Sequence, residues 1–453
     1  MGFAQRLAQW VCEFHAASVA PRVQQQAKLL LLDSLGCAFA ALDEPTAQAT
    51  LRAIAAMGGT PECTVIGAGV RTSVANAVLA NGVLIRTLDV NDFGSGPRTS
   101  GHPSDNIAVA LAVGERHGCS GRDVLAAIVL GYELYNRMPP SLAKHDPWDG
   151  VSKSAIVAAC MAGWLQHLPV EALANAIALS VSHCNTLSIV RRGQLSAAKS
   201  IANSMVTHTA MVATLLAAEG VTGPPTAMEE WADAVLAGAD LSALVAPLDG
   251  EFRIMEVSIK AYPSLATSQA AVAAAIQLHS AIAGPLNEVE KIDVRMADIP
   301  FVSSQVYDAE RRNPTTRETA DHSFPFLIAA ALLDGELTLR QFEHERWFDP
   351  SVRALMGRMM IETDEGLNRY GEESGYPCAI SVLTKDGREH RAEVPYHRGH
   401  AKNKMDAGEV QTKFNRYAAP ALSEPQRKRI IQQMERLETL PSLQQFMPLL
   451  AAR

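Results

Sequence analysis

The sequence predicts a mainly α-helical fold, with a large all-α domain built from both ends of the chain and a smaller α+β domain between them. Hydrophobic residues make up 48% of the 453 residues and aromatic residues only 6%, and the abundant alanine favours closely packed helices. Near residue 285 the apolar pattern changes to an alternating one, and after residue 405 the helical pattern returns. We therefore expect the helical domain at 1–269 and 401–453, and the α+β domain at 270–400.

The helices are predicted from the spacing of apolar residues together with residues that start or stop a helix. Pro21 suits a first helical turn, Ser120 suits an N-cap, and Gly118 suits the end of the helix before it. The run Gly223-Pro224-Pro225 follows the longest helical pattern. The helices expected up to that run span 4–18, 21–42, 73–88, 103–118, 121–138, 151–166, 169–183 and 195–219.

Short alternating segments predict the strands of the α+β domain. Asp386-Gly387 is a strong hairpin signal between two of them. The expected strands span 291–296, 356–363, 379–384 and 390–394, with helical pieces at 323–333 and 350–355 between the first two. Residues 405–417 and 424–452 are expected to be helical again.

Charge and cysteine usage narrow the class of protein. The net charge of −8 argues against nonspecific binding to nucleic acid, which needs a basic surface. The seven cysteines are scattered and form no CxxC pair, which is typical of reduced thiols in a cytosol. No signal peptide and no run of about 18 apolar residues is present. We expect a cytoplasmic protein without a nucleic-acid or membrane partner.

The loop at 86–106 is the most informative part of the chain. It holds Asp89, Asp92, His102 and Asp105 between two apolar helical segments. Such polar groups must meet water, one another or a ligand. We interpret His102 as a general acid or base and Asp89 as its partner, whereas Asp92 and Asp105 suit structural roles. In the competing interpretation, His102 caps the next helix and Asp89 bridges helix ends.

Cationic residues in later segments could hold an anion. Arg191 and Arg192 stand before Gly193, and Lys199 follows among alanine and serine residues. Arginine suits a bidentate grip on a carboxylate and lysine acts as a point charge, although a lysine on a helix can also extend its charged end to solvent. Lys260 precedes an apolar helix and is a further carboxylate-binding candidate.

Two further segments contribute candidates. Ser264, Thr267 and Ser268 could line a pocket, or they could form a plain junction between loop and helix. Tyr307 and His322 bound a charged stretch whose other charges suit a solvated face. The chain has no GxGxxG after a strand and no GxxxxGK[ST], HExxH or GxSxG motif, which disfavours dinucleotide redox chemistry, nucleotide hydrolysis and serine hydrolysis.

Several segments together resemble one known family. The chain is similar to the MmgE/PrpD family, whose members include 2-methylcitrate dehydratase, cis-aconitate decarboxylase and iminodisuccinate epimerase. The segments LDVNDF and GHPSDN and the later segment YHRGH are most similar to the 2-methylcitrate dehydratase branch. The matching segments are LLDSLGCAFAAL (31–42), NGVLIRTLDVNDF (81–93), GHPSDN (101–106), AAKSIANSM (197–205), KAYPS (260–264), HSFPFLIAAALLDG (322–335) and YHRGH (396–400).

The resemblance implies a homodimer whose α+β domain forms a lid over the helical domain, with the site between the two. It implies a small anionic polycarboxylate as substrate, and neither a metal nor an organic cofactor. The catalytic residues that follow are Asp89, His102, Lys199 and Tyr307. The resemblance also carries over Lys260 and His322 as substrate-binding residues, and we predict that Arg191, Arg192, Thr267 and Gln269 bind the substrate with them.

Two positions depart from the family pattern. Gly150 stands where the resemblance would place a histidine, and His145 lies five residues earlier. Thr267 stands where the dehydratase branch has a histidine before Ser-Gln. The predicted function is a cofactor-independent lyase that dehydrates a 2-methylcitrate-like alkylcitrate. The alternatives are decarboxylation of a cis-aconitate type of acid, epimerisation of a dicarboxylate, and binding of a polycarboxylate without catalysis.

Overall fold

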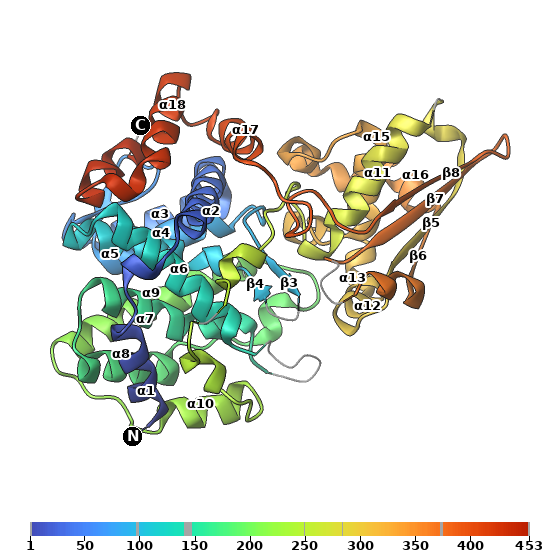
Figure 1. Ribbon diagram of the computed structural model, residues 1–453. Coiled ribbons are helices and arrows are strands. Elements are labelled where there is room, and N and C mark those ends of the chain that lie inside the picture. Colours follow the sequence, from blue (N-terminus) through green and yellow to red (C-terminus); the bar gives the residue numbers. More distant parts are fainter. Residues whose placement is uncertain are drawn as a thin grey trace.

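The computed structural model describes residues 2–96, 99–139, 147–248, 250–282, 284–371 and 375–451. Apolar side chains are buried in two separate clusters, one drawn from 3–259 and 410–450 and the other from 265–394. Figure 1 shows the corresponding helical part and α+β part side by side. The mainly α-helical fold with a small α+β part is confirmed, and the predicted domain boundaries stay predictions.

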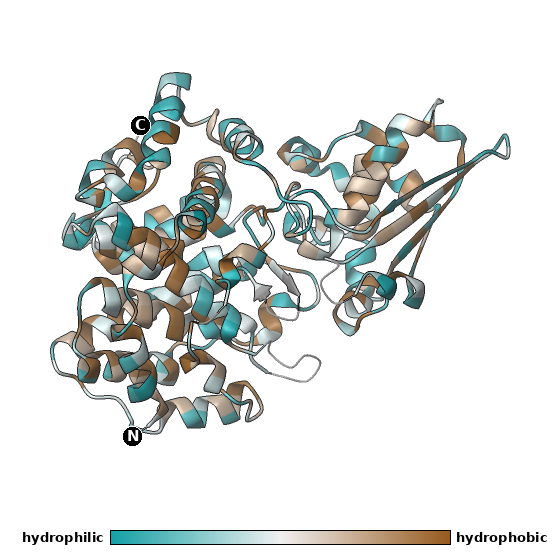
Figure 2. Ribbon diagram, in the orientation of Figure 1, coloured by the Kyte–Doolittle hydropathy of each residue, from teal (hydrophilic) through white to brown (hydrophobic). Residues whose placement is uncertain are grey.

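The helical part is built from amphipathic and fully apolar helices. Figure 2 shows hydrophobic residues concentrated along its inner helices, while its outer helices carry more hydrophilic ones. α9 packs against α4, α7 and α8. The helices of this part are α1 (Phe3–Cys12), α2 (Pro21–Ala40), α3 (Pro45–Met57), α4 (Val74–Arg86), α5 (Ile107–His117), α6 (Gly121–Arg137), α7 (Ser154–Leu165), α8 (Val170–His183), α9 (Ala198–Ala218), α10 (Ala227–Val235), α17 (Ala407–Ala418) and α18 (Glu424–Glu435).

The α+β part contains a four-stranded sheet in the order β6-β5-β7-β8. β5 (Val289–Ala297) pairs in parallel with β6 (Met359–Asp364) and antiparallel with β7 (Cys378–Thr384), which forms the predicted hairpin with β8 (Glu389–Val394). Buried residues alternate along β7, so one face of the sheet is covered. α11 packs against β7, β8 and α15. The helices of this part are α11 (Gln269–Ala281), α12 (Pro300–Val306), α13 (Ala309–Arg312), α14 (Arg317–Ala320), α15 (Phe324–Asp334) and α16 (Pro350–Met356).

The structure differs from the prediction at some element ends. The expected helix at 424–452 stops at Glu435 and continues as three short 3₁₀ turns. Pro441 and Pro448 lack the backbone N–H that a continuous helix needs, which explains the break. Two small antiparallel pairs were not predicted: β1 (Cys63–Thr64) with β2 (Arg71–Thr72), and β3 (Gly94–Gly96) with β4 (Thr99–Gly101).

α9 is the one helix in the described ranges that is long and apolar enough to span a membrane. Of its most apolar window, 56% is buried inside the protein. The same length and apolarity are typical of the central helix of a folded domain.

Candidate active site

Asp89 is the centre of a buried cluster of charges. It follows the C-terminus of α4, and its carboxylate accepts hydrogen bonds from three cationic side chains. Arg86 donates to Oδ1, Lys260 donates to Oδ1 over 2.7 Å, and Lys199 at the start of α9 donates to Oδ2 over 3.2 Å. The four side chains are at most 2% exposed. These cations lower the pKa of Asp89 well below its usual value, with Arg86 contributing most, against a desolvation that would raise it.

The backbone at Asp89 is held in an uncommon conformation. Asp89 has φ +51°, a left-handed value that residues other than glycine adopt rarely. Lysine side chains hold the two backbone carbonyls that follow the Asp89 Cα. Lys260 Nζ donates to the Asp89 carbonyl over 2.7 Å, and Lys413 Nζ on α17 donates to the Val90 carbonyl over 2.9 Å.

Lys413 in turn forms an ion pair with Asp33 on α2. Its Nζ lies 2.6 Å from Asp33 Oδ1, and both side chains are buried. The ion pair compensates the buried charge of Lys413, which is thereby kept against the turn that presents Asp89. Asp33 and Lys413 are therefore positioning residues that act on Asp89 through the backbone.

A double variant tests this positioning role. Asp33→Asn/Lys413→Met removes both charges together, so neither is left buried without a partner, and the Val90 carbonyl loses its donor. We expect kcat/KM on the substrate to fall about tenfold, because small misplacements of a catalytic group are costly. We expect kcat to carry most of this loss and KM to change little. Circular dichroism and kinetics check the expectation, and an unchanged kcat in a folded variant would contradict it.

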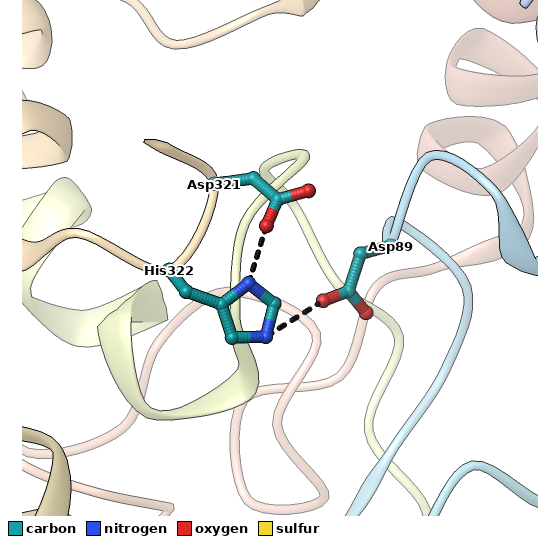
Figure 3. A group of neighbouring side chains, drawn as sticks. All are labelled: Asp89, Asp321 and His322. Atoms are coloured by element: carbon teal, nitrogen blue, oxygen red, sulfur yellow. Dashed lines mark hydrogen bonds and ion pairs between the residues drawn. The ribbon is translucent and has the colours of Figure 1, made fainter. Parts of the chain in front are cut away.

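His322 lies between two carboxylates, as Figure 3 shows. Its Nδ1 hydrogen-bonds Asp321 Oδ1, and its Nε2 lies 3.4 Å from Asp89 Oδ2. Asp321 also lies 3.4 Å from Lys199 Nζ. Burial and then the Lys199 ammonium lower the pKa of His322 to about 4. A neutral ring that donates Nδ1–H to Asp321 carries its lone pair on Nε2, facing Asp89.

His102 approaches Asp89 from the other carboxylate oxygen. Its Nε2 lies 4.0 Å from Asp89 Oδ1. Its Nδ1 lies 2.6 Å from the carbonyl oxygen of Asp92, which only accepts, so Nδ1 carries the proton. Burial lowers the pKa of His102 well below its usual value, with Arg86 and Lys260 adding to the effect. Neutral His102 thus turns an unprotonated Nε2 toward Asp89, and neutral His322 does so in the tautomer that donates Nδ1–H to Asp321.

Exposure defines the face from which a ligand can reach the cluster. The His102 and His322 side chains are 18% and 12% exposed, whereas those of Lys199 and Lys260 are 1% and 0% exposed. The imidazoles therefore form the accessible face and the cations lie beneath it. Burial lowers the pKa of Lys260 to about 8, although Asp89 raises it. At neutral pH the lysine remains mostly charged.

A second set of polar residues fixes the loop that carries His102. Asp105 lies 3.5 Å from Arg86, accepts from Asn91 over 2.8 Å, and through its carbonyl accepts from Asn203 over 3.2 Å. Asp92 accepts hydrogen bonds from Ser104 and Tyr132. Burial raises the pKa of Asp92 to about 7 and that of Asp105 to about 6.

The carboxylates and the imidazole could suggest a metal site, because ligand atoms of Asp89, Asp321 and His322 lie within 4.8 Å of one another. The surrounding charges do not fit a divalent cation. Lys199 contacts both carboxylates, and Lys260 and Arg86 occupy Asp89 Oδ1. A metal ion here would face three positive groups at close range. The donor set instead suits an anionic ligand.

The structure brings together five of the candidates from the sequence: Asp89, His102, Lys199, Lys260 and His322. Sequence reasoning missed Arg86 and Asp321 as members of the cluster. Arg86 stands three residues before Asp89 in the last turn of α4, and Asp321 directly precedes His322. Both residues are neighbours of a predicted site residue in the sequence. Whether their side chains point toward it depends on the course of the backbone, which the sequence does not show.

The other candidates have different contacts. Tyr307 is 57% exposed, and its hydroxyl lies 3.4 Å from Thr363 Oγ1. Thr267 donates to Gln305. Gln269 bonds the backbone of the loop after Lys260, accepting from the N–H of Ala261 and of Tyr262 over 3.0 and 3.2 Å. No bond from any of these three residues to Asp89 is present among the described residues.

Arg191 is the last residue of a 3₁₀ turn (Ser188–Arg191) before α9, and Arg192 follows it. Arg191 Nε bonds Asp149 Oδ2 over 2.6 Å, and Arg192 is exposed. Asp149 also caps the turn Gly150–Lys153, so Gly150 starts a structural element. His145 lies outside the described residues.

Comparisons with known proteins identify the family of this chain. The model of the MmgE/PrpD N-terminal domain matches residues 5–242, and that of the MmgE/PrpD C-terminal domain matches residues 262–439. Cis-aconitate decarboxylase of Mus musculus is 26% identical over 447 residues, covering 92% of this chain and 86% of its own length. Two 2-methylcitrate dehydratases are also similar. That of Cupriavidus necator is 27% identical over 390 residues, covering 79% and 77% of the two chains.

The second, from Escherichia coli K12, is 26% identical over 448 residues, covering 91% and 90%. The relatives are thus dehydratases and decarboxylases, and the matched domains span most of the sequence on both sides of residue 250. The chain belongs to the MmgE/PrpD family.

Proposed function

We propose that the protein is a cofactor-independent lyase that acts on a small polycarboxylic acid by dehydrating a 2-methylcitrate-like alkylcitrate. The observation that carries the proposal is the pair of neutral imidazoles above a buried layer of cations. His102 and His322 offer Nε2 lone pairs, and Lys199, Lys260 and Arg86 supply positive charge around Asp89.

The residue types fit proton removal next to a carboxylate. The Nε2 of His322 removes a proton from the carbon beside a substrate carboxylate, and Asp321 stabilises the imidazolium that forms. The electron pair moves into the carboxylate, whose growing negative charge is stabilised by Lys199 and its neighbouring cations. Lys199 Nζ lies 3.2 Å from Asp89 Oδ2 and 3.4 Å from Asp321 Oδ1, and in the proposed reaction it turns from Asp89 to the substrate carboxylate.

Loss of hydroxide completes the elimination. His102 in its imidazolium form protonates the leaving hydroxyl, which departs as water while the carbon–carbon double bond forms. The negative substrate favours this protonated form, because an adjacent anion raises the pKa of an imidazole. His322 then passes its proton to solvent and His102 regains one, which restores the starting state.

A product panel tests the proposal. The purified protein is incubated with citrate, 2-methylcitrate, longer alkylcitrates, cis-aconitate and trans-aconitate, and the mixtures are followed by mass spectrometry. We expect an alkylcitrate to yield an alkene lighter by one water. Release of carbon dioxide from cis-aconitate would favour decarboxylation, and a change of chirality at constant mass would favour epimerisation. Binding without turnover across the panel would contradict a lyase.

We also propose that two copies of the chain pair through α9. The outward face of this helix exposes Met205, Val212 and Leu216, and beyond Lys199 the helix has no acidic or basic residue other than His208. A symmetric partner presents the same apolar face, so pairing would desolvate few charges. Because α9 also supplies Lys199, the pair would stiffen the element that carries a site residue.

Light scattering with size-exclusion chromatography checks the pairing. We expect the unmodified protein to run at twice 48.6 kDa, and Met205→Glu/Leu216→Glu to run as a monomer, because two buried carboxylates would face each other across the interface. Met57→Glu, at another exposed methionine, serves as the control and should remain paired. A monomeric unmodified protein would contradict the proposal. Cytoplasmic location and the absence of nucleic-acid and membrane partners remain predictions.

A further inference from the structure

A second polar feature lies in the α+β part, away from the Asp89 cluster. It is a cavity of about 90 Å³, and none of the residues around Asp89 lines it. Segments from α12, α13, α15, α16 and β6 enclose it. The lining residues are Gln305, Val306, Arg311, Arg312, Phe324, Pro325, Met356, Met359 and Ile361.

Arg311 brings an incompletely paired positive charge to this cavity. The residue is only 9% exposed. Its Nε lies 3.3 Å from Asp308 Oδ2, but Nε and Nη1 are buried without a hydrogen-bond partner among the described residues. Burial lowers the pKa of Arg311, although Asp308 raises it. Buried guanidinium donors without acceptors are costly, and Arg311 also lines the cavity, where an anion would place negative charge beside them.

Gln305 supplies a second donor. Its Oε1 accepts a hydrogen bond from Thr267, which fixes the orientation of the amide and leaves Nε2 as its free end. Within the described ranges, the bond from Thr267 is the one hydrogen bond of the Gln305 side chain. Arg312 adds a further positive charge, and its Nη2 donates to the Val306 carbonyl over 3.5 Å. The residues that line the cavity thus carry two positive charges and no negative one, and Asp308 and Asp321 lie close enough to offset part of the charge of Arg311.

The remaining walls are apolar. Val306, Phe324, Pro325, Met356, Met359 and Ile361 contribute hydrocarbon and thioether surface. By the same measure of volume one water needs about 10–15 Å³, so the cavity holds an occupant of roughly six to nine water-sized units. The walls and size fit a short alkyl chain, and the donors fit a carboxylate.

We propose that this cavity is a binding site for a small carboxylate with a short alkyl chain, held by Arg311 and Gln305. The occupant would pack against Phe324, the first residue of α15 and two residues after His322. The ligand could come from a free monocarboxylate or from one arm of a larger acid that also reaches the Asp89 cluster. Both sources share the same chemistry, and binding can be measured without turnover.

Calorimetric titration with butyrate tests the proposal, with 1-butanol as the uncharged match. We expect saturable binding of one butyrate per chain and none of butanol. Arg311→Met should weaken butyrate binding about tenfold or more, because it removes the charged donors. Arg340→Met, at an exposed arginine of the same part of the chain, should leave the affinity unchanged.

A second variant keeps the test decisive if Arg311→Met folds poorly. Ile361→Phe fills the cavity and retains the arginine, and it should abolish butyrate binding. A crystal soaked with 4-bromobutyrate should place bromine among Phe324, Met356 and Ile361.

Saturating citrate distinguishes the two sources of the ligand. It should leave the affinity for butyrate unchanged if the site is independent, and it should displace butyrate if an arm of citrate enters the cavity. No saturable butyrate binding, equal binding by Ile361→Phe, or bromine only at the Asp89 cluster would overturn the proposal.

Discussion

Replacing His322 with glutamine is expected to lower turnover by about 10²- to 10⁴-fold, the usual contribution of a positioned general base. Glutamine keeps a polar side chain of similar reach but cannot take up a proton. Asp321 and Lys199 would retain their ion pair, so the variant should fold. Steady-state kinetics on the substrate identified by the product panel measures the effect. The loss should appear in kcat, because the cations that hold the carboxylates remain.

The pH profile separates a base from a structural residue. Because the pKa of His322 is lowered to about 4, the acid limb of the kcat/KM profile, where protonation removes the base, should lie near pH 4 in the unmodified protein. The glutamine variant should lose this acid limb. His183→Gln, at an exposed position at the end of α8, is the matched control and should turn over normally. Normal turnover in His322→Gln would remove His322 from the mechanism.

Replacing Asp89 with asparagine is expected to lower the free energy of unfolding by about 3–5 kcal/mol, because it leaves buried cations without their shared anion. Lys260 depends on it most directly, being 0% exposed and bonded to both the carboxylate and the carbonyl of Asp89. Denaturant unfolding at pH 7 measures the loss. Activity should fall with it, since the amide cannot hold the cations in place.

The deficit should shrink as the pH rises from 7 toward 8. Asp89 raises the pKa of Lys260 against burial, so without Asp89 this pKa falls further below about 8. A lysine whose pKa is lower in the folded state releases its proton on folding, so stability rises with pH above the folded pKa. In the variant this rise in stability begins at a lower pH than in the unmodified protein, so the difference between the two narrows. Asp349→Asn, at an exposed carboxylate, is the control, and a deficit independent of pH would contradict the account of the cluster.

The fold was predictable because its pattern is local. The hairpin at Asp386-Gly387 and the apolar helix ending at Gly335 follow from short stretches of sequence, and both are present. The error at 424–452 arose where apolar spacing continued through Pro441 and Pro448. The proline rule excludes a continuous helix through residues 441 and 448, but it does not predict that α18 ends as early as Glu435.

The site was predictable only in part, since its contacts join distant residues. Residue type and family resemblance selected Asp89, His102, Lys199 and Lys260, and the structure places them together. Neither residue type nor resemblance selects Lys413, because it lies on an amphipathic helix where a lysine ordinarily faces water. It is buried against Asp33 because α17 packs against α2 in the fold. The roles of Tyr307, Thr267, Gln269, Arg191 and Arg192 stay predictions.

The contact between Lys413 and the Val90 carbonyl has a consequence for protein synthesis. A nascent chain that has emerged from the ribosome through residue 400 already contains both imidazoles and three of the cations, yet it lacks the support for the bend at Asp89. The apolar cluster of the helical part likewise joins Phe3 with Leu450. Such remote pairings form late in folding, so activity should appear only after translation of this region is complete, and a prematurely terminated product should be inert.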